Sequence, residues 1–238
     1  GWAYYTERVR QADYALGEEV IKEYFQMENV RQGVFDNSNK LYGLNFKKIE
    51  DVVLCNPEAE AFEVTDADGS LIGVITTDYY PRSTKRSGAW MNNIRDQRID
   101  AEGNDIRPII CNVGNFNKPT GDTPSLLSID NVETLFHEFG HALHGLLAHS
   151  TYATVSGTSV ARDFVELPSQ INENWAFQPE VLKTYARHYK TGEVIPDDLI
   201  AKIEATGDFN MGFVTGELAA ASILDMKWHE LSSIYVPA

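Results

Sequence analysis

Cysteine is scarce in this chain, because Cys55 and Cys111 are the only two among its 238 residues. Two cysteines are too few for a disulfide framework, and neither has a second cysteine at the spacing of a C-x-x-C metal motif. We expect both side chains to be buried thiols. A fold stapled by disulfides is therefore excluded.

Basic residues and long apolar runs are scarce as well. The chain has 20 Lys and Arg against 35 Asp and Glu, so its net charge is -15. Such a charge repels phosphate backbones and anionic lipid, and we therefore expect neither nucleic acid nor a membrane as a partner. No apolar run approaches the roughly 18 residues of a membrane helix, and the first residues lack the features of a signal peptide. We expect a monomeric, cytoplasmic protein.

The first half of the chain changes its pattern once. In residues 2–30 apolar and aromatic residues recur at helical spacing, which predicts two helices broken near Gly17. In residues 52–117 apolar and polar residues alternate around a turn signal from Asp66 to Gly69. This alternation predicts a β-hairpin.

The second half predicts one more strand and then helices. The stretch "RPIICNVGNF", residues 107–116, is rich in β-forming residues, and "NKPTGDTPS", residues 117–125, should break regular structure. Helical spacing dominates after Asp130, and either Asp130 or Asn131 can cap the helix that follows. The expected fold is α+β and predominantly helical, a single domain with a small β-sheet.

That helix contains "ETLFHEFGHALHGLL", residues 133–147. His137 and His141 lie four residues apart, about 6 Å along the axis at 1.5 Å per residue, so both imidazoles can reach one metal ion. Glu138 follows His137 directly, and in an H-E-x-x-H motif this glutamate takes a proton from metal-bound water. Without an ion, a buried helix would leave these polar groups unpartnered. The motif therefore predicts a zinc site rather than a chance pattern.

The third ligand must come from outside this helix. The metzincin pattern would require glycine at position 144 and histidine at position 147, where this chain has His144 and Leu147. His144 is about 10 Å along the helix from His137, too far to share the ion. It either makes a supporting hydrogen bond or lies exposed to solvent.

A second helix is expected downstream, and three carboxylates on it could complete the site, namely Asp163, Glu166 and Glu173. A flexible "SGTS" loop before them lets this helix fold back towards the histidines. Spacing alone does not rank the three, and any single acid at a helix start is more often simply solvated.

Several motifs resemble one family. "FHEFGHALH" followed by "SGTSVARDFVELPSQINENWAF" closely resembles the thimet-oligopeptidase-like zinc metallopeptidases, and "RDFVELPSQ" looks most like their bacterial peptidyl-dipeptidase (dipeptidyl carboxypeptidase) branch. "KRSGAW" and "CNVGNFNKP" are similar to segments upstream of the zinc helix in that family. The resemblance implies a zincin-like core in which His137, His141 and Glu166 bind Zn²⁺ and Glu138 is the general base. Glu133 would orient His137, or would simply be a charge near the helix N-terminus.

The resemblance implies a zinc peptidase that removes C-terminal dipeptides from oligopeptides. Two alternatives stay open: an oligoendopeptidase of the same family, and a non-catalytic module in which zinc serves folding alone. The strand in "IICNVGNF" could pair with substrate backbone along a free edge, or it could be an ordinary core strand.

Family members are several hundred residues longer, and a Gly/Tyr-rich segment after their last helix supplies the donors that stabilise the oxyanion. We therefore expect residues 1–238 to be part of a zinc metallopeptidase catalytic domain, without its N-terminal helical region and its C-terminal part. On this expectation the isolated chain binds zinc but turns over poorly.

Overall fold

The computed structural model describes residues 2–14, 17–207 and 209–232. The chain divides into two compact units, one formed by residues 17–200 and the other by residues 1–16 and 201–238. The first unit contains the β-sheet and the helix with the H-E-x-x-H motif. The second consists of helices where it is described.

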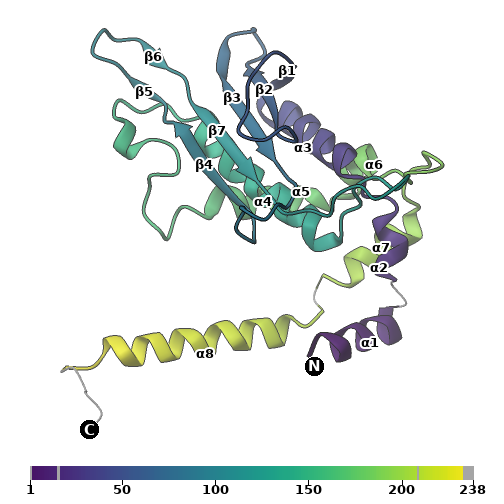
Figure 1. The fold of residues 1–238 in the computed structure, drawn as a ribbon. Helices are drawn as coiled ribbons and strands as arrows, with labels where there is room; N and C mark the ends of the chain where they lie inside the picture. The colour runs from purple at the N-terminus through teal and green to yellow at the C-terminus, as the bar shows by residue number, and fades with distance from the viewer. Residues whose placement is uncertain (1, 15–16, 208, 233–238) are drawn as a thin grey trace. The chain divides into compact units, whose positions relative to one another are not determined.

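The first unit is built on a five-stranded mixed sheet (Figure 1). In spatial order its strands are β1 (Asn45–Ile49), β2 (Glu60–Thr65), β3 (Leu71–Asp78), β7 (Ile109–Val113) and β4 (Trp90–Arg95). β3 and β7 run parallel, and the other neighbours are antiparallel. Two further short strands, β5 (Arg98–Ile99) and β6 (Asp105–Ile106), form a separate ladder.

The predicted hairpin is confirmed in β2 and β3, which pair antiparallel. Its turn is closed by two backbone hydrogen bonds, from the Asp66 N–H to the Ser70 carbonyl at 2.9 Å and from the Gly69 N–H to the Asp66 carbonyl at 3.0 Å. Gly69 has a φ of +84°, a left-handed conformation that glycine adopts without a steric penalty. The turn chemistry thus sets the register of the two strands.

Helices cover one face of this sheet (Figure 1). The helices that pack directly on the sheet are α3 (Met27–Tyr42) and α4 (Ile129–Leu146). The unit also contains α2 (Glu18–Lys22), α5 (Leu167–Ala176), α6 (Pro179–Tyr185) and a 3₁₀ turn, η1 (Ala153–Val155). α4 packs on β7 and β4, α5 packs along α4, and α3 contacts α4 and α6. The predicted break near Gly17 is present, because Gly17 precedes the first turn of α2. α3 was not predicted beyond residue 30.

The cap of α4 differs from the prediction. Ser128 is the N-cap, and its hydroxyl accepts a hydrogen bond from the Asn131 N–H at 3.1 Å, while the Asn131 side chain accepts one from the Ser128 N–H at 3.5 Å. Neither Asp130 nor Asn131 is therefore the N-cap. Asn131 serves instead as the second member of a capping box, which satisfies two N–H groups at the helix start.

Aromatic side chains join α3, α4 and the sheet. Phe35 of α3 stacks on Phe46 of β1 with ring centroids 4.2 Å apart, and Phe139 of α4 lies 5.7 Å from both rings. Phe136, on the preceding turn of α4, is fully buried. α4 is consequently held in the core and carries its histidines on a rigid support.

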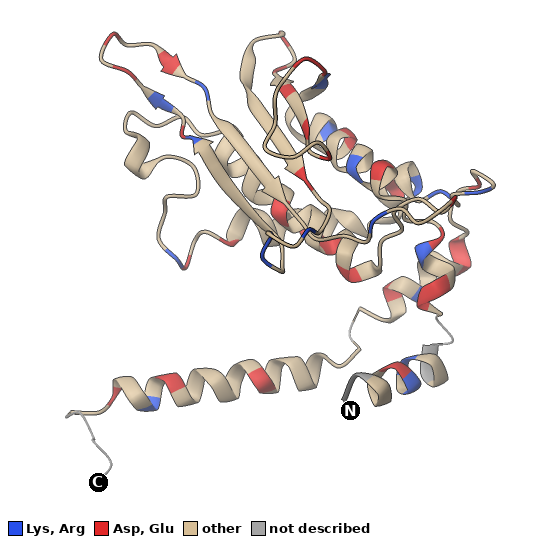
Figure 2. Cartoon of the chain, in the orientation of Figure 1, with Lys and Arg blue, Asp and Glu red and all other residues tan. Residues whose placement is uncertain are grey.

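Charged side chains lie mainly on helices and loops, while β7 carries none and β3 carries only Asp78 at its end (Figure 2). Along both strands buried residues alternate with partly buried or exposed ones, the pattern of a sheet with one face packed on the core. The expectation of two buried thiols is wrong for Cys55, which is exposed, whereas Cys111 on β7 is partly buried. Burial raises the pKa of the Cys111 thiol.

The second unit contains α1 (Trp2–Tyr14) and α8 (Met211–His229), and the boundary between the units falls within α7 (Asp197–Ala205). α8 is predominantly apolar, yet none of its residues is buried. No helix in the described ranges is both long and apolar enough to span a membrane.

Candidate metal centre

Three side chains from two helices converge on one point. His137 and His141 project from successive turns of α4, and one carboxylate oxygen of Glu166, Oε2, lies 3.3 Å from the Nε2 of His137 and 3.1 Å from the Nε2 of His141. One nitrogen or oxygen of each residue lies within 4.8 Å of the others. Three such atoms can contact a single ion.

Glu166 is held in its charged form. It immediately precedes α5, and the Ser169 hydroxyl donates a hydrogen bond to its Oε2 at 2.9 Å. This hydrogen bond, with smaller contributions from His141 and His137, holds the pKa of the Glu166 carboxyl below its usual range. The carboxylate is therefore available as a ligand at neutral pH.

Gly140 permits the close approach of α5 to α4. A Cβ at this position would lie 2.6 Å from the carbonyl oxygen of Pro168 and 2.6 Å from the Cα of Ser169, both backbone atoms of α5. The buried Asn172 side chain also ties the helices, donating to the Phe136 carbonyl at 2.7 Å. Because Gly140, between His137 and His141 in the sequence, has no side chain, α5 can approach α4 closely enough for Glu166 to reach both histidines.

The change Gly140→Ala is expected to destabilise the protein by roughly 1–3 kcal/mol and to weaken metal binding, because α5 must move away from α4. Thermal unfolding of the metal-free protein and its metal content measure the two effects. Gly216→Ala is the matched control, since Gly216 is also helical and nothing lies within 4 Å of the added Cβ. Equal behaviour of the two variants would contradict this account.

The second nitrogen of His137 has a carboxylate partner on α5. His137 Nδ1 lies 2.5 Å from Oε1 of Glu173, which is seven residues, or two helical turns, after Glu166. Such a contact fixes the ring and directs Nε2 towards the ion. The sequence left open whether Glu133 orients His137 or is a charge near the helix N-terminus. In the described structure no hydrogen bond joins Glu133 to His137, and burial and the nearby Glu173 raise the pKa of its carboxyl.

Glu173→Gln is expected to lower metal affinity about 10- to 100-fold, the usual effect of losing a carboxylate behind a histidine ligand. Competition with a chromophoric chelator measures this affinity. Glu133→Gln removes a neighbouring acid of the same type and should change the affinity less than about 3-fold, well below that range. The reverse order would restore Glu133 as the group that orients His137.

Glu138 lies beside the three converging side chains. Its residue is only 9% exposed, and its Oε2 is buried without a hydrogen-bond partner among the described residues. Burial is the main cause that raises the pKa of the Glu138 carboxyl to about 7. A carboxyl group with this pKa can accept and return a proton near neutral pH.

The other sequence candidates lie outside this group. Asp163 is exposed in the segment before α5 and is not among the converging side chains. His144 packs edge-on against Phe164, with ring centroids 6.1 Å apart, and burial lowers the pKa of its imidazole. Of the three carboxylates that spacing left open, the structure brings Glu166 to both histidines and Glu173 to one.

The proposed free edge is not in "IICNVGNF". β7 pairs with β3 on one side and β4 on the other, so this segment is an ordinary core strand and the peptide-edge alternative is wrong for it. Asn112 is fully buried there, and its side chain donates to the Glu138 carbonyl at 2.8 Å. The edge next to α4 belongs to β4, whose sequence "WMNNIR" gave no alternating signal.

The donor set fits a divalent metal. Two imidazole nitrogens and one carboxylate oxygen are typical ligands of catalytic zinc, which keeps a further position for water or substrate. The unpartnered carboxylate oxygen of Glu138 beside them is the group that such a site needs for proton transfer. His137, His141 and Glu166 could therefore hold the ion.

Comparison with known proteins supports this chemistry. The model for peptidase family M3 matches residues 1–235. The chain belongs to this family.

Among its M3 relatives, the dipeptidyl carboxypeptidase of Salmonella typhimurium is 46% identical over 97% of this chain. The Escherichia coli protein of the same name is 44% identical over 96% of the chain, and Escherichia coli oligopeptidase A is 37% identical over 95%. The aligned regions cover 34%, 33% and 34% of these relatives, so the chain spans about one third of their length.

Proposed function

We propose that the protein is a zinc metallopeptidase of zincin-like fold that releases dipeptides from the C-terminus of oligopeptides. The observation that carries this proposal is the convergence of His137, His141 and Glu166 beside the buried Glu138. Zn²⁺ bound by those three residues would polarise the scissile carbonyl and make water a stronger nucleophile. We further propose that residues 1–238 belong to one catalytic domain of a cytoplasmic monomer.

Glu138 is the proton carrier in this proposal. Its carboxylate accepts a proton from the attacking water and then gives it to the leaving amine. In the metal-free protein burial raises the pKa of this carboxyl to about 7, so Glu138 exchanges a proton nearer neutral pH than an exposed glutamate does. Burial lowers the pKa of His141, so its imidazole stays neutral, which is the form that binds a metal.

Substrate would bind along β4. This strand is the edge of the sheet next to α4, and an extended peptide can add to such an edge through backbone hydrogen bonds. Antiparallel addition is the commoner arrangement and pairs somewhat more stably. The peptide would then pass over the helix that carries Glu138.

The names of the relatives favour C-terminal dipeptide release over internal cleavage. The two relatives above 40% identity are named dipeptidyl carboxypeptidase, while oligopeptidase A is 37% identical. Cleavage of internal bonds is the second candidate, because it needs the same metal and the same base.

Peptide hydrolysis by the intact zinc-loaded protein tests the proposal. We expect a free-acid oligopeptide to lose its C-terminal dipeptide, a chelator to stop the reaction and zinc to restore it. A peptide amidated at its C-terminus should be cut much more slowly; equal rates would identify an endopeptidase. No cleavage of either peptide at full zinc occupancy would overturn the assignment as a peptidase.

A further inference from the structure

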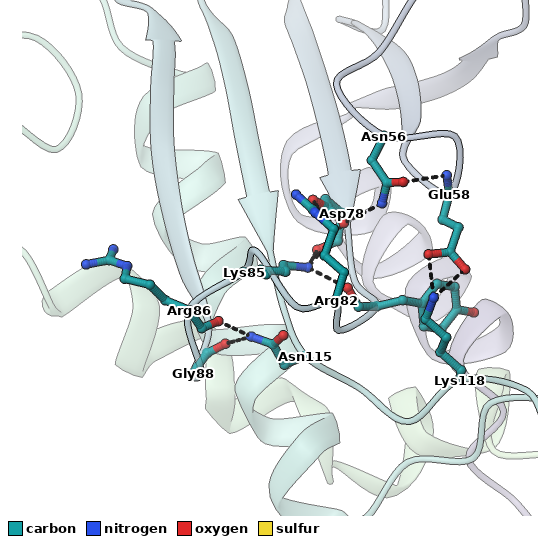
Figure 3. Close-up of polar contacts among 10 residues, drawn as sticks. Asn56, Glu58, Asp78, Arg82, Lys85, Arg86, Gly88, Asn115 and Lys118 are labelled. Atoms are coloured by element: carbon teal, nitrogen blue, oxygen red, sulfur yellow. Dashed lines mark hydrogen bonds and ion pairs between the residues drawn. The ribbon is translucent and has the colours of Figure 1, made fainter.

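The loop between β3 and β4, residues 79–89, carries three cations, of which two form ion pairs with one acid, Asp78 (Figure 3). Lys85, whose side chain is 2% exposed, forms an ion pair with Asp78 at 3.1 Å and donates to the Asp78 and Tyr80 carbonyls at 2.6 and 2.9 Å. Arg82 pairs with the other oxygen of Asp78 at 2.6 Å. Both charges are therefore used to fix the loop.

Arg86 in the same loop is different. Asn115 holds its backbone, donating to the carbonyls of Arg86 at 2.8 Å and Gly88 at 2.7 Å, but the Arg86 side chain is exposed. Its guanidinium lies over the Trp90 ring, 5.1 Å from the centroid, and no described carboxylate forms an ion pair with it. Figure 3 shows this side chain directed away from the Asp78 group.

Strand register relates Arg86 to the metal centre. Met91 of β4 is paired with Asn112 of β7, and the Asn112 side chain donates to the carbonyl of Glu138. Glu138 therefore lies near the first residues of β4. This strand begins only a few residues after Arg86. A peptide lying antiparallel along the outer edge of β4 directs its C-terminus towards Trp90 and the loop that precedes it.

The distance along the peptide also fits. Extended chain advances about 3.4 Å per residue, so a carboxylate two residues beyond the scissile bond lies roughly 7 Å past the reaction centre. Counted back along β4 from Met91, whose partner Asn112 contacts the Glu138 carbonyl, this step reaches the start of the strand, where the Arg86 guanidinium lies over the Trp90 ring. Stacking on an aromatic ring orients the planar guanidinium and leaves its N–H groups free for a bidentate contact with a carboxylate.

We propose that Arg86 binds the free C-terminal carboxylate of the peptide substrate and so limits cleavage to the second bond from the end. This inference rests on the proposed peptidase function and adds a specificity residue to it. Trp90 positions the guanidinium, while Lys85 and Asn115 hold the loop in place.

Peptide binding to the zinc-loaded Glu138→Gln protein tests this proposal without turnover. Isothermal titration calorimetry compares one oligopeptide as the free acid and as its C-terminal amide. We expect the free acid to bind roughly 10- to 100-fold more tightly, the usual effect of a hydrogen-bonded charge pair. Adding Arg86→Gln should remove this preference and leave the affinity for the amide unchanged, and Arg86→Lys should restore part of it.

Arg82→Gln is the matched control, because it removes a cation of the same loop that already has a partner, while the buried Lys85 keeps its contacts with Asp78 and Tyr80 that hold the loop. It should keep the preference for the free acid. Retention of the full preference in Arg86→Gln, or no preference in the parent, would overturn the role of Arg86 and leave the peptidase assignment intact. Failure of both peptides to bind any zinc-loaded variant would overturn the proposed function and this inference with it.

Discussion

Replacing Glu166 with alanine is expected to remove most of the bound metal. The Oε2 of this residue lies 3.3 and 3.1 Å from the Nε2 atoms of His137 and His141, so its loss leaves only two of the three side chains proposed to bind the ion. We expect metal affinity to fall by more than about 100-fold, beyond the 10- to 100-fold effect of losing a supporting partner. Elemental mass spectrometry after gel filtration measures metal content, and chelator competition measures affinity.

Asp163→Ala is the control for this experiment. Asp163 lies three residues earlier in the same segment and was an equal candidate by spacing, but it is exposed and outside the converging group. It should retain the metal content of the unchanged protein. Equal metal in Glu166→Ala and the unchanged protein would show that the third ligand is another group.

The sequence predicted the part of the site that depends on local geometry. His137, Glu138 and His141 lie within five residues of one helix, whose period sets which side chains share a face. Glu166 could not be predicted in this way, because it lies about thirty residues after His137 and reaches the histidines only through the packing of α5 on α4. Spacing therefore left three acids open, and only the family resemblance singled out Glu166.

The order of the strands could not be predicted for a related reason. β4 precedes β7 in the chain, yet β7 lies between β3 and β4 in the sheet. Nothing in the "IICNV" segment distinguishes a core strand from an edge strand, because this distinction depends on non-local pairing. The free charge of Arg86 is local in sequence, but it depends on the fold of the loop, because Lys85 and Arg82 both pair with Asp78.

Glu138 is the proposed general base. Replacing it in Glu138→Gln is expected to lower kcat of the intact protein by about 10²- to 10⁴-fold. Glutamine keeps the size of the side chain but cannot accept a proton. Metal content and KM should change little, because Glu138 does not belong to the converging ligands and acts on the attacking water.

The fold should also tolerate this change. The Oε2 of Glu138 has no hydrogen-bond partner in the described residues, and burial raises the pKa of its carboxyl to about 7. The folded metal-free protein therefore binds this proton more tightly than the unfolded chain does, and the charged carboxylate destabilises it increasingly as the pH rises from about 4.5 towards 7. Removal of that charge should leave the melting temperature of the metal-free protein at pH 7.5 equal or higher.

The matched control is Glu133→Gln, five residues earlier on α4, where burial also raises the pKa of the carboxyl. Its kcat should stay within about 3-fold of the unchanged protein, far from the loss expected for a general base. If Glu138→Gln retained more than a tenth of the kcat at equal metal content, another group would have to carry the proton. If it lost activity together with metal, the effect would be structural, and the role of Glu138 as a base would be refuted.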